Sequence, residues 1–257
     1  MKEEIKVKNL SFSYGETIIL KDINLSFTKG NFYSVIGPNG SGKSTFIKNI
    51  SKILSPMANS VFIDNIDISN ISNKKLAQRM ALIPQDIKIE YDFTVFDVVM
   101  MGRSPYKRRF EDFNVEDNKI VEKYMKATNT WCLKDKLITE LSGGESQRVI
   151  AARALTQETD IILLDEPTSH LDIQYQIEFL KIFKSLRMDK VIIAVLHDLN
   201  LASTFSDEII LINKGELVSK GTPWQVINKE NIKEVYNLQV EVFENPINKC
   251  PYIIPIV

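Results

Sequence analysis

The sequence predicts an α/β protein: a mixed, largely parallel sheet, an N-terminal antiparallel β subdomain and an inserted α-helical subdomain. Three observations support this fold class. Residues 5–36 alternate between apolar and polar positions and are interrupted by glycine turns. After residue 36, helical segments alternate with short, wholly apolar strands. Between about 87 and 158 strand patterns disappear and helical patterns dominate. Alternating strands indicate a sheet with one buried face, whereas wholly apolar strands indicate a parallel sheet covered by helices.

The antiparallel part is expected to begin with a strand through Ile5, Val7 and Leu10 that ends before Gly15. Two further strands are expected at 18–27 and 32–36, the latter after a turn at Lys29–Asn31. Because side chains in a strand alternate between faces, this period-two pattern predicts that all three strands belong to one antiparallel sheet.

The parallel part is expected to contain apolar strands at 161–164, 191–196 and 209–212. Helices are expected at 44–50, 144–155 and 173–186. The last of these places four apolar residues on one stripe, as a helix that covers a sheet requires: Ile177, Leu180, Phe183 and Leu186.

Composition excludes several classes of protein. The formal net charge of the 257 residues is −1, which gives no electrostatic reason to expect nucleic acid as the main partner. The two cysteines, Cys132 and Cys250, have no CxxC spacing, which argues against a zinc site. The basic run at 107–109 is followed by acidic residues and is expected to be a solvated loop. No apolar run approaches the ~18 residues that span a bilayer, so we expect no transmembrane segment.

A phosphate-binding loop is the strongest functional signal. Residues 37–45 match G-x-x-x-x-G-K-[ST], follow an apolar strand and open a helix. Glycines let the backbone amides approach phosphate oxygens, Lys43 would reach the β- and γ-phosphates, and Ser44 would bind Mg²⁺. The complete set of nucleotide-binding residues expected here is Gly37, Pro38, Asn39, Gly40, Ser41, Gly42, Lys43, Ser44 and Thr45.

Two adjacent carboxylates follow the apolar strand at 161–164. Asp165 is placed to hold Mg²⁺, and Glu166 to act as the general base for the water that attacks the γ-phosphate. The alternative is that the two acids merely cap the next element.

A second anion-binding helix start is expected at Leu141–Glu145, where Ser142 precedes Gly143 and Gly144. The chain's own nucleotide is already bound by the P-loop and does not need a second anion site. A nucleotide bound to another copy of the chain could occupy it. An ordinary N-cap with a nearby glutamate is the alternative.

Taken in order, these motifs resemble those of the ABC transporter ATPases. Residues 37–45 resemble Walker A, Gln85 the Q-loop, Leu141–Glu145 the signature and 161–166 Walker B. Ser169–Asp172 resemble the D-loop and His197 the switch histidine. One departure is Glu145, where the commonest signature has Gln. His170, within the D-loop, is assigned no chemistry.

The resemblance covers the whole chain and implies one nucleotide-binding domain. Residues 1–86 and 159–257 would form a RecA-like P-loop NTPase core with its antiparallel β subdomain, and 87–158 an inserted helical signature subdomain. It implies that ATP and Mg²⁺ are bound, with Tyr14 stacking on adenine, although a half-buried surface tyrosine is the alternative. Gln85 would sense Mg²⁺ and the attacking water, and His197 would contact the γ-phosphate.

The implied partners are a second copy in a head-to-tail nucleotide sandwich, an integral membrane permease dimer, and a substrate-binding protein that acts through the permease. The chain would then lie peripherally on the cytoplasmic face of the cell membrane. The permease would dock near 91–103, although Phe93, Phe96, Val99 and Met100 could equally be core residues.

The segments 98–106 and His197–Asn200, with the tail around Gly221–Pro223, resemble the ATPases of importers for iron–siderophore complexes, haem and cobalamin. Two alternatives stay open. One is an importer of another cargo, such as a metal ion or phosphonate. The other is an ABC ATPase without a permease, of the iron–sulfur assembly type.

Overall fold

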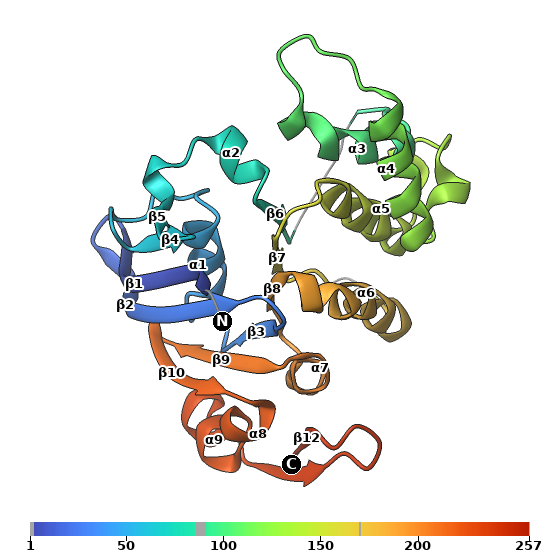
Figure 1. The fold of residues 1–257 in the computed structure, drawn as a ribbon. Coiled ribbons are helices and arrows are strands. Elements are labelled where there is room, and N and C mark those ends of the chain that lie inside the picture. Colours follow the sequence, from blue (N-terminus) through green and yellow to red (C-terminus); the bar gives the residue numbers. More distant parts are fainter. Residues whose placement is uncertain (1–2, 86–90, 170, 257) are drawn as a thin grey trace. The chain divides into compact units, whose positions relative to one another are not determined.

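The computed structural model describes residues 3–85, 91–169 and 171–256. The chain folds into two compact units (Figure 1). The first unit is formed by residues 1–71 and 187–257, so the two ends of the chain, blue and orange to red in Figure 1, fold together. The second unit is the continuous segment 72–186.

An antiparallel sheet opens the first unit. Its strand order is β2-β1-β4-β5, with β1 at Glu3–Tyr14, β2 at Thr17–Thr28, β4 at Val61–Ile63 and β5 at Ile66–Asp67. The register pairs Tyr14 with Thr17 across a turn at Gly15, whose φ of +58° favours glycine. The predicted N-terminal antiparallel subdomain is therefore confirmed.

The prediction that the third strand belongs to this sheet was wrong. β3 (Phe32–Ile36) pairs in parallel with β8 (Val191–Val195) on one side and β9 (Glu208–Asn213) on the other. All five of its residues are buried, as they must be in a strand covered on both faces. β10 (Glu216–Gly221) pairs antiparallel with β9, so the sheet is mixed.

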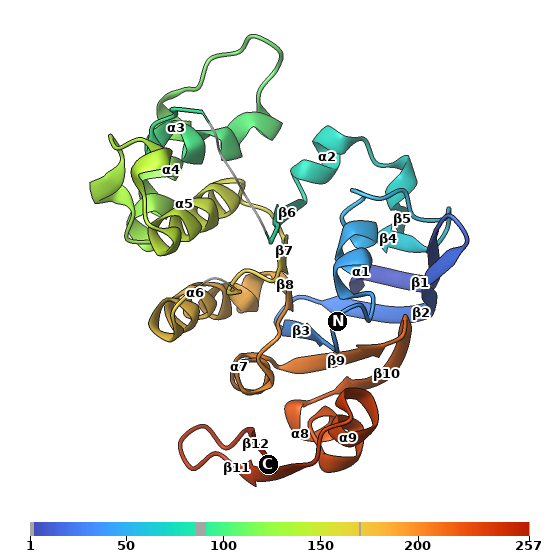
Figure 2. The same ribbon diagram turned by 180° about the vertical axis from the view of Figure 1, so that it is seen from behind.

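Helices and a C-terminal hairpin complete the first unit. Its helical segments are α1 (Lys43–Ile50), η1 (Ile68–Asn70), η5 (Arg187–Asp189), α7 (Leu199–Phe205), α8 (Pro223–Val226) and α9 (Lys229–Tyr236). The hairpin consists of β11 (Val240–Glu244) and β12 (Pro251–Pro255), paired antiparallel. Figure 2 shows this hairpin beside α7, with which β12 is in contact.

The second unit is mainly helical. It contains the parallel strands β6 (Met80–Ile83) and β7 (Ile161–Asp165). Its helical segments are α2 (Asn73–Ala77), α3 (Val95–Met100), η2 (Met101–Tyr106), α4 (Val115–Ala127), η3 (Trp131–Leu133), η4 (Ile138–Glu140), α5 (Gly143–Thr156) and α6 (Ile173–Leu186). The structure therefore places helices, and no β-strand, in the described residues between 91 and 158. The proposed boundaries of the insert at 87 and 158 stay a prediction.

Helix α6 has the predicted bounds, but the buried stripe is shifted. Leu180 and Phe183 are buried as expected, whereas Ile177 and Leu186 are only partly buried. Phe179 takes a buried place beside Phe183, with 4.9 Å between the ring centroids.

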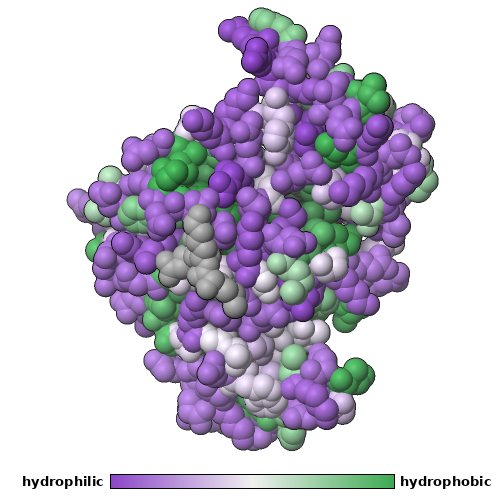
Figure 3. All heavy atoms as spheres, in the orientation of Figure 1, coloured by the Kyte–Doolittle hydropathy of each residue, from purple (hydrophilic) through white to green (hydrophobic). Residues whose placement is uncertain are grey.

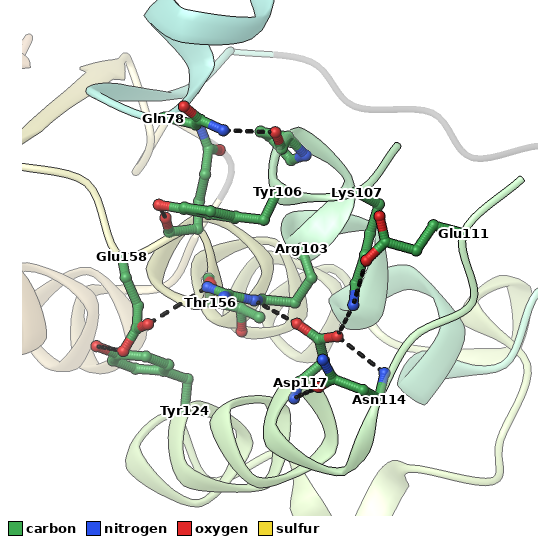
Figure 4. Close-up of polar contacts among 12 residues, drawn as sticks. Gln78, Arg103, Tyr106, Lys107, Glu111, Asn114, Asp117, Tyr124, Thr156 and Glu158 are labelled. Carbon is green, nitrogen blue, oxygen red and sulfur yellow. Dashed lines mark hydrogen bonds and ion pairs between the residues drawn. The ribbon is translucent and has the colours of Figure 1, made fainter. Parts of the chain in front are cut away.

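A polar cluster centred on two buried residues, Arg103 and Asp117, ties η2 to its neighbours in the second unit (Figure 4). We call the residues Arg103, Lys107, Asn114, Asp117 and Glu158 the Arg103 cluster. The Arg103 guanidinium donates to Asp117 and Glu158 and to the carbonyl of Thr156 at 3.0 Å. Asp117 also belongs to the capping box that begins α4, so one carboxylate serves both the helix start and the ion pairs.

The surface carries no broad apolar area on the face seen in Figure 3, where hydrophobic side chains lie in small separate groups among hydrophilic ones. In the described part of the chain, no helix combines the length and hydrophobicity needed to span a bilayer.

Candidate functional site

The P-loop connects β3 to α1 in the first unit, as predicted. Gly37, Gly40 and Gly42 have φ values of +152°, +77° and +105°, which side-chain-bearing residues rarely adopt. A Cβ on Gly37 would lie 2.1 Å from the carbonyl oxygen of Ile212, so that position also needs glycine for close packing. A Cβ on Gly40 would meet nothing within 4 Å, so the loop is open there.

The start of α1 is prepared for an anion. Its N-cap is Gly42, which has no side chain to satisfy the first amides, and the first turn holds no acidic residue. The Ser41 hydroxyl is buried without a hydrogen-bond partner among the described residues. Uncapped amides at a helix N-terminus favour phosphate, so this loop fits a nucleotide.

Lys43 is 4% exposed, and its ammonium group donates to the carbonyls of Gly37 and Pro38, both at 2.9 Å. The charge is thus held against the loop itself. Ser44 and Thr45 are partly exposed on the first turn of α1, and Asn39 is exposed.

Two further predicted residues lie in the first unit. Tyr14 ends β1 with 48% of its surface exposed, and its ring meets Phe12 edge-on with 5.0 Å between the centroids. The exposed ring is accessible to a base, as stacking requires. His197 is exposed two residues after β8, and Asp198 then caps α7.

The other predicted residues lie in the second unit. Asp165 ends β7 and is 5% exposed. Glu166 follows with a φ of +52°, a left-handed conformation that is uncommon for glutamate. The Glu166 carbonyl accepts from the amide and hydroxyl of Ser169, at 3.3 and 3.1 Å, which closes the turn. Gln85 is exposed after β6.

The signature residues open α5 in the second unit. Ser142 is the N-cap, and its amide and hydroxyl both donate to Oε2 of Glu145, at 2.9 and 2.7 Å. These hydrogen bonds lower the pKa of Glu145, the backbone bond contributing most. Gly143 is exposed, while the ring of Tyr175 lies 3.3 Å from where a Cβ on Gly144 would be. The ordinary N-cap named above as the alternative is therefore present. A phosphate bound at the start of α5 would have to compete with the Glu145 carboxylate for the amide and hydroxyl of Ser142.

Several residues that hold the site together were missed by sequence reasoning. In the second unit, Gln147 of α5 donates to the carbonyl of Pro167 at 2.9 Å, which joins the signature helix to the turn after β7. Gln176 donates to the carbonyls of Thr168 and Leu171 and supports the D-loop turn. His170 lies outside the described residues.

Tyr236 in the first unit was also missed. Burial raises the pKa of its hydroxyl, and a hydrogen bond with the backbone of Gly37 opposes that rise. The end of α9 therefore lies at the first P-loop glycine. No sequence motif marks this tyrosine, because it lies about 200 residues from the loop that it contacts.

The donor types fit a magnesium ion better than a metal held by protein alone. Within the described residues, no three His, Cys, Asp or Glu side chains form a group that could hold a metal. Mg²⁺ needs no such cage, because it takes one or two protein ligands and completes its shell with water and substrate phosphates. The Ser44 hydroxyl and the Asp165 carboxylate are donors of that kind.

Comparison with known proteins agrees with these features. Residues 20–169 match the family model described as ABC transporter. The chain is 35% identical to the petrobactin import ATP-binding protein FpuD of Bacillus anthracis, over 99% of this chain and 94% of that one. It is 34% identical to the ferric enterobactin transport ATP-binding protein FepC of Escherichia coli, over 98% and 94%. A solved structure, described as an inward-facing conformation of a metal-chelate type transporter, aligns with a TM-score of 0.86 and 25% identity over 100% of this chain and 98% of that one.

Proposed function

The chain belongs to the ABC transporter family as an ATP-binding and ATP-hydrolysing subunit, and we propose that it drives uptake of an iron–siderophore complex through a separate permease. The observation that supports this class of cargo is 34–35% identity, along almost the whole of both chains, to proteins named for petrobactin import and ferric enterobactin transport. Haem and cobalamin are the other cargoes included in this proposal.

The first unit would hold the nucleotide. Tyr14 would stack on the adenine, the amides of Gly37–Thr45 would receive the phosphates, and Lys43 would turn from the loop carbonyls to the β- and γ-phosphates. That exchange is favourable because phosphate is a stronger acceptor for an ammonium group than a neutral carbonyl. Mg²⁺, held by Ser44, Asp165 and Gln85, would supply charge neutralisation at the phosphates.

Hydrolysis requires that a water be oriented and deprotonated. Glu166, which follows directly after β7, would accept the proton of the attacking water. Gln85 would orient the same water, and His197 would donate to the γ-phosphate. The protein's contribution is positioning and charge stabilisation, as in phosphoryl transfer generally.

A second copy of the chain would complete the site. Ser142, Gly143 and Gly144 would face the γ-phosphate of the partner's ATP in a head-to-tail sandwich, and Asp172 would lie at the dimer interface. In support, the signature turn at the start of α5 is largely exposed and open to a partner.

The permease would dock near 91–103, and burial narrows the surface that can take part. Val99 and Met100 are 0% and 5% exposed and therefore belong to the core. Tyr91 and Phe93 are 73% and 40% exposed, with 6.2 Å between their ring centroids. This aromatic pair could receive an apolar segment of the permease. The chain would then lie peripherally at the cytoplasmic face of the membrane. A separate substrate-binding protein would deliver the cargo to the permease. Nucleic acid would not be a partner.

Uptake in cells that lack this chain tests the cargo. Labelled ferric siderophore, haem and cobalamin are offered in parallel, with rescue by the wild type or by Glu166→Gln. We expect loss of siderophore uptake that only the wild type restores. Unchanged uptake of all three cargoes would contradict the proposal and favour another cargo, such as a metal ion or phosphonate, or a role without a permease.

A further inference from the structure

The side chain of Asn200 joins α7 to the C-terminal hairpin in the manner of a backbone peptide group. Its Oδ1 accepts from the amide of Ile253 at 2.8 Å, and its Nδ2 donates to the carbonyl of the same residue at 3.3 Å. β12 thereby gains a partner on the side facing α7. Asparagine is suited to this double contact because its amide carries one acceptor and one donor side by side.

The contact between α7 and the hairpin has an exposed part, where Nδ2 of Asn248 donates to the hydroxyl of Thr204 at 3.2 Å, and a buried part. Ser203, which is fully buried, donates to the carbonyl of Pro251 at 2.5 Å. Ile253 of β12 and Ala202 of α7 are also buried. A fully satisfied buried polar contact fixes one arrangement, because any slip would leave its groups unpaired.

The C-terminal end of α7 is fixed to the strand that leads to the P-loop. The hydroxyls of Ser206 and Ser34 lie 2.6 Å apart, and both residues are buried. Ser34 lies on β3, three residues before Gly37. The helix is therefore held between β3 and the C-terminal hairpin.

His197 lies at the start of this helix. The Asp198 carboxylate caps α7 by accepting from the amides of Asn200 and Leu201, at 2.8 and 2.9 Å. The backbone between His197 and Asn200 is thus fixed by the cap at one end and by the hairpin at the other. A shift of α7 would be transmitted directly to the histidine.

We propose that Asn200 is a positioning residue for ATP hydrolysis, which fixes α7 to the C-terminal hairpin and thereby holds His197 in place. This inference rests on the function proposed above for His197. It assigns the C-terminal hairpin a part in the reaction.

Proton NMR of the imidazole groups measures this link directly, because the sequence contains two histidines, His170 and His197. A His170→Gln variant assigns the two signals. In Asn200→Ala we expect the His197 resonance to move or broaden, while the His170 resonance stays in place. A circular dichroism melt shows that the variant is folded. An unmoved His197 signal in folded Asn200→Ala would overturn the proposal.

Hydrolysis kinetics give the second measurement. Asn200→Ala should lower kcat by roughly tenfold, since misplacing a catalytic group by about 1 Å can cost up to a hundredfold. The KM for ATP should change less than about twofold, because the P-loop is untouched. Asn200→Asp keeps the acceptor but loses the donor, so its kcat should fall between those of Asn200→Ala and the wild type.

Trp224→Phe is the matched control, because Trp224 donates to the carbonyl of Lys249 at 2.9 Å and so anchors the same hairpin away from α7. An equal loss of kcat in this control would indicate a merely structural role and refute the proposal. A His197→Ala variant with wild-type hydrolysis would refute the role of the histidine itself. Neither measurement uses cargo, so an error in the cargo assignment cannot affect them.

Discussion

The carboxylate of Asp117 accepts a hydrogen bond from Nε of Arg103 at 3.0 Å, and the two residues are only 3% and 8% exposed. Removing one member of such a buried pair leaves the other charge uncompensated. We therefore expect Asp117→Asn to lower the free energy of unfolding by about 3 kcal/mol. Urea titration checks this, with Lys119→Ala as the control, since the pair between Lys119 and Glu116 is exposed and should contribute less than about 0.5 kcal/mol.

The same carboxylate predicts a pH dependence of stability. Burial by itself would raise the pKa of Asp117, but hydrogen bonds from the Asn114 amide, Lys107 and Arg103 outweigh it and lower the pKa. A carboxylate with a lowered pKa in the folded state stabilises the protein above its unfolded pKa of about 3.9, and that stability is lost as the pH falls through the folded value. The difference in unfolding free energy between wild type and Asp117→Asn should therefore be constant above about pH 5 and shrink below about pH 4. A difference that instead grew towards acid would contradict the assignment.

The carboxylate of Glu145 should weaken phosphate binding at the signature. It accepts hydrogen bonds from the amide and hydroxyl of Ser142 and places a negative charge at the start of α5. Glu145→Gln removes the charge and should lower the KM for ATP by about two- to fivefold, the equivalent of 0.3–1 kcal/mol at a helix N-terminus. The ATP dependence of hydrolysis measures this. Glu140→Gln is the control, since Glu140 makes a similar bond to the amide of Leu137 outside the signature. An unchanged or higher KM in Glu145→Gln would refute the idea that the Glu145 carboxylate weakens phosphate binding.

Lys43→Ala should weaken nucleotide binding by about ten- to a hundredfold, because a hydrogen bond to a charged group contributes roughly 1.5–3 kcal/mol. Fluorescence titration with a labelled ATP analogue checks this. Lys48→Ala, on the same helix but away from the loop, should bind normally. A normal dissociation constant for Lys43→Ala would refute the phosphate assignment.

Glu166→Gln should slow hydrolysis by at least about a hundredfold while ATP binding is retained, since a general base typically contributes 10²–10⁴-fold. An ATP-bound dimer should then accumulate, and light scattering with ATP and Mg²⁺ would detect it. Only monomers under these conditions would argue against the nucleotide sandwich.

Local patterns predicted much of the fold because the relevant forces are local. The wholly apolar runs became buried strands, and α6 has the predicted bounds because its periodic pattern is strong. The pairing of β3 was not predictable in this way. Its partners β8 and β9 lie more than 150 residues further along the chain, and alternation cannot reveal which sheet a strand joins.

The P-loop glycines and the residues after β7 were predicted because phosphate and Mg²⁺ require particular residue types at fixed spacing. The residues that support them carry no such requirement. Three of them contact backbone groups elsewhere in the chain: Asn200, Gln147 and Tyr236. Before the fold is known, the sequence does not distinguish such a polar side chain from one that is simply exposed to solvent. The Arg103 cluster was missed for the same reason, since Asp117 and Glu158 each look like solvated charges on a helix or a turn.

The way in which the ends of the chain combine in the first unit has a consequence for protein synthesis. Residues 72–186 form one continuous segment of the chain, whereas β3 must wait until β8 and β9 have been synthesised before it can pair. The P-loop is present in the first 45 residues, but the strand that supports it has no partner until β8 ends at Val195, about three-quarters of the way along the chain, and gains its second partner only when β9 ends at Asn213. Nascent chains that end before residue 213 should therefore bind no ATP, and the capacity to bind nucleotide arises only as translation nears its end.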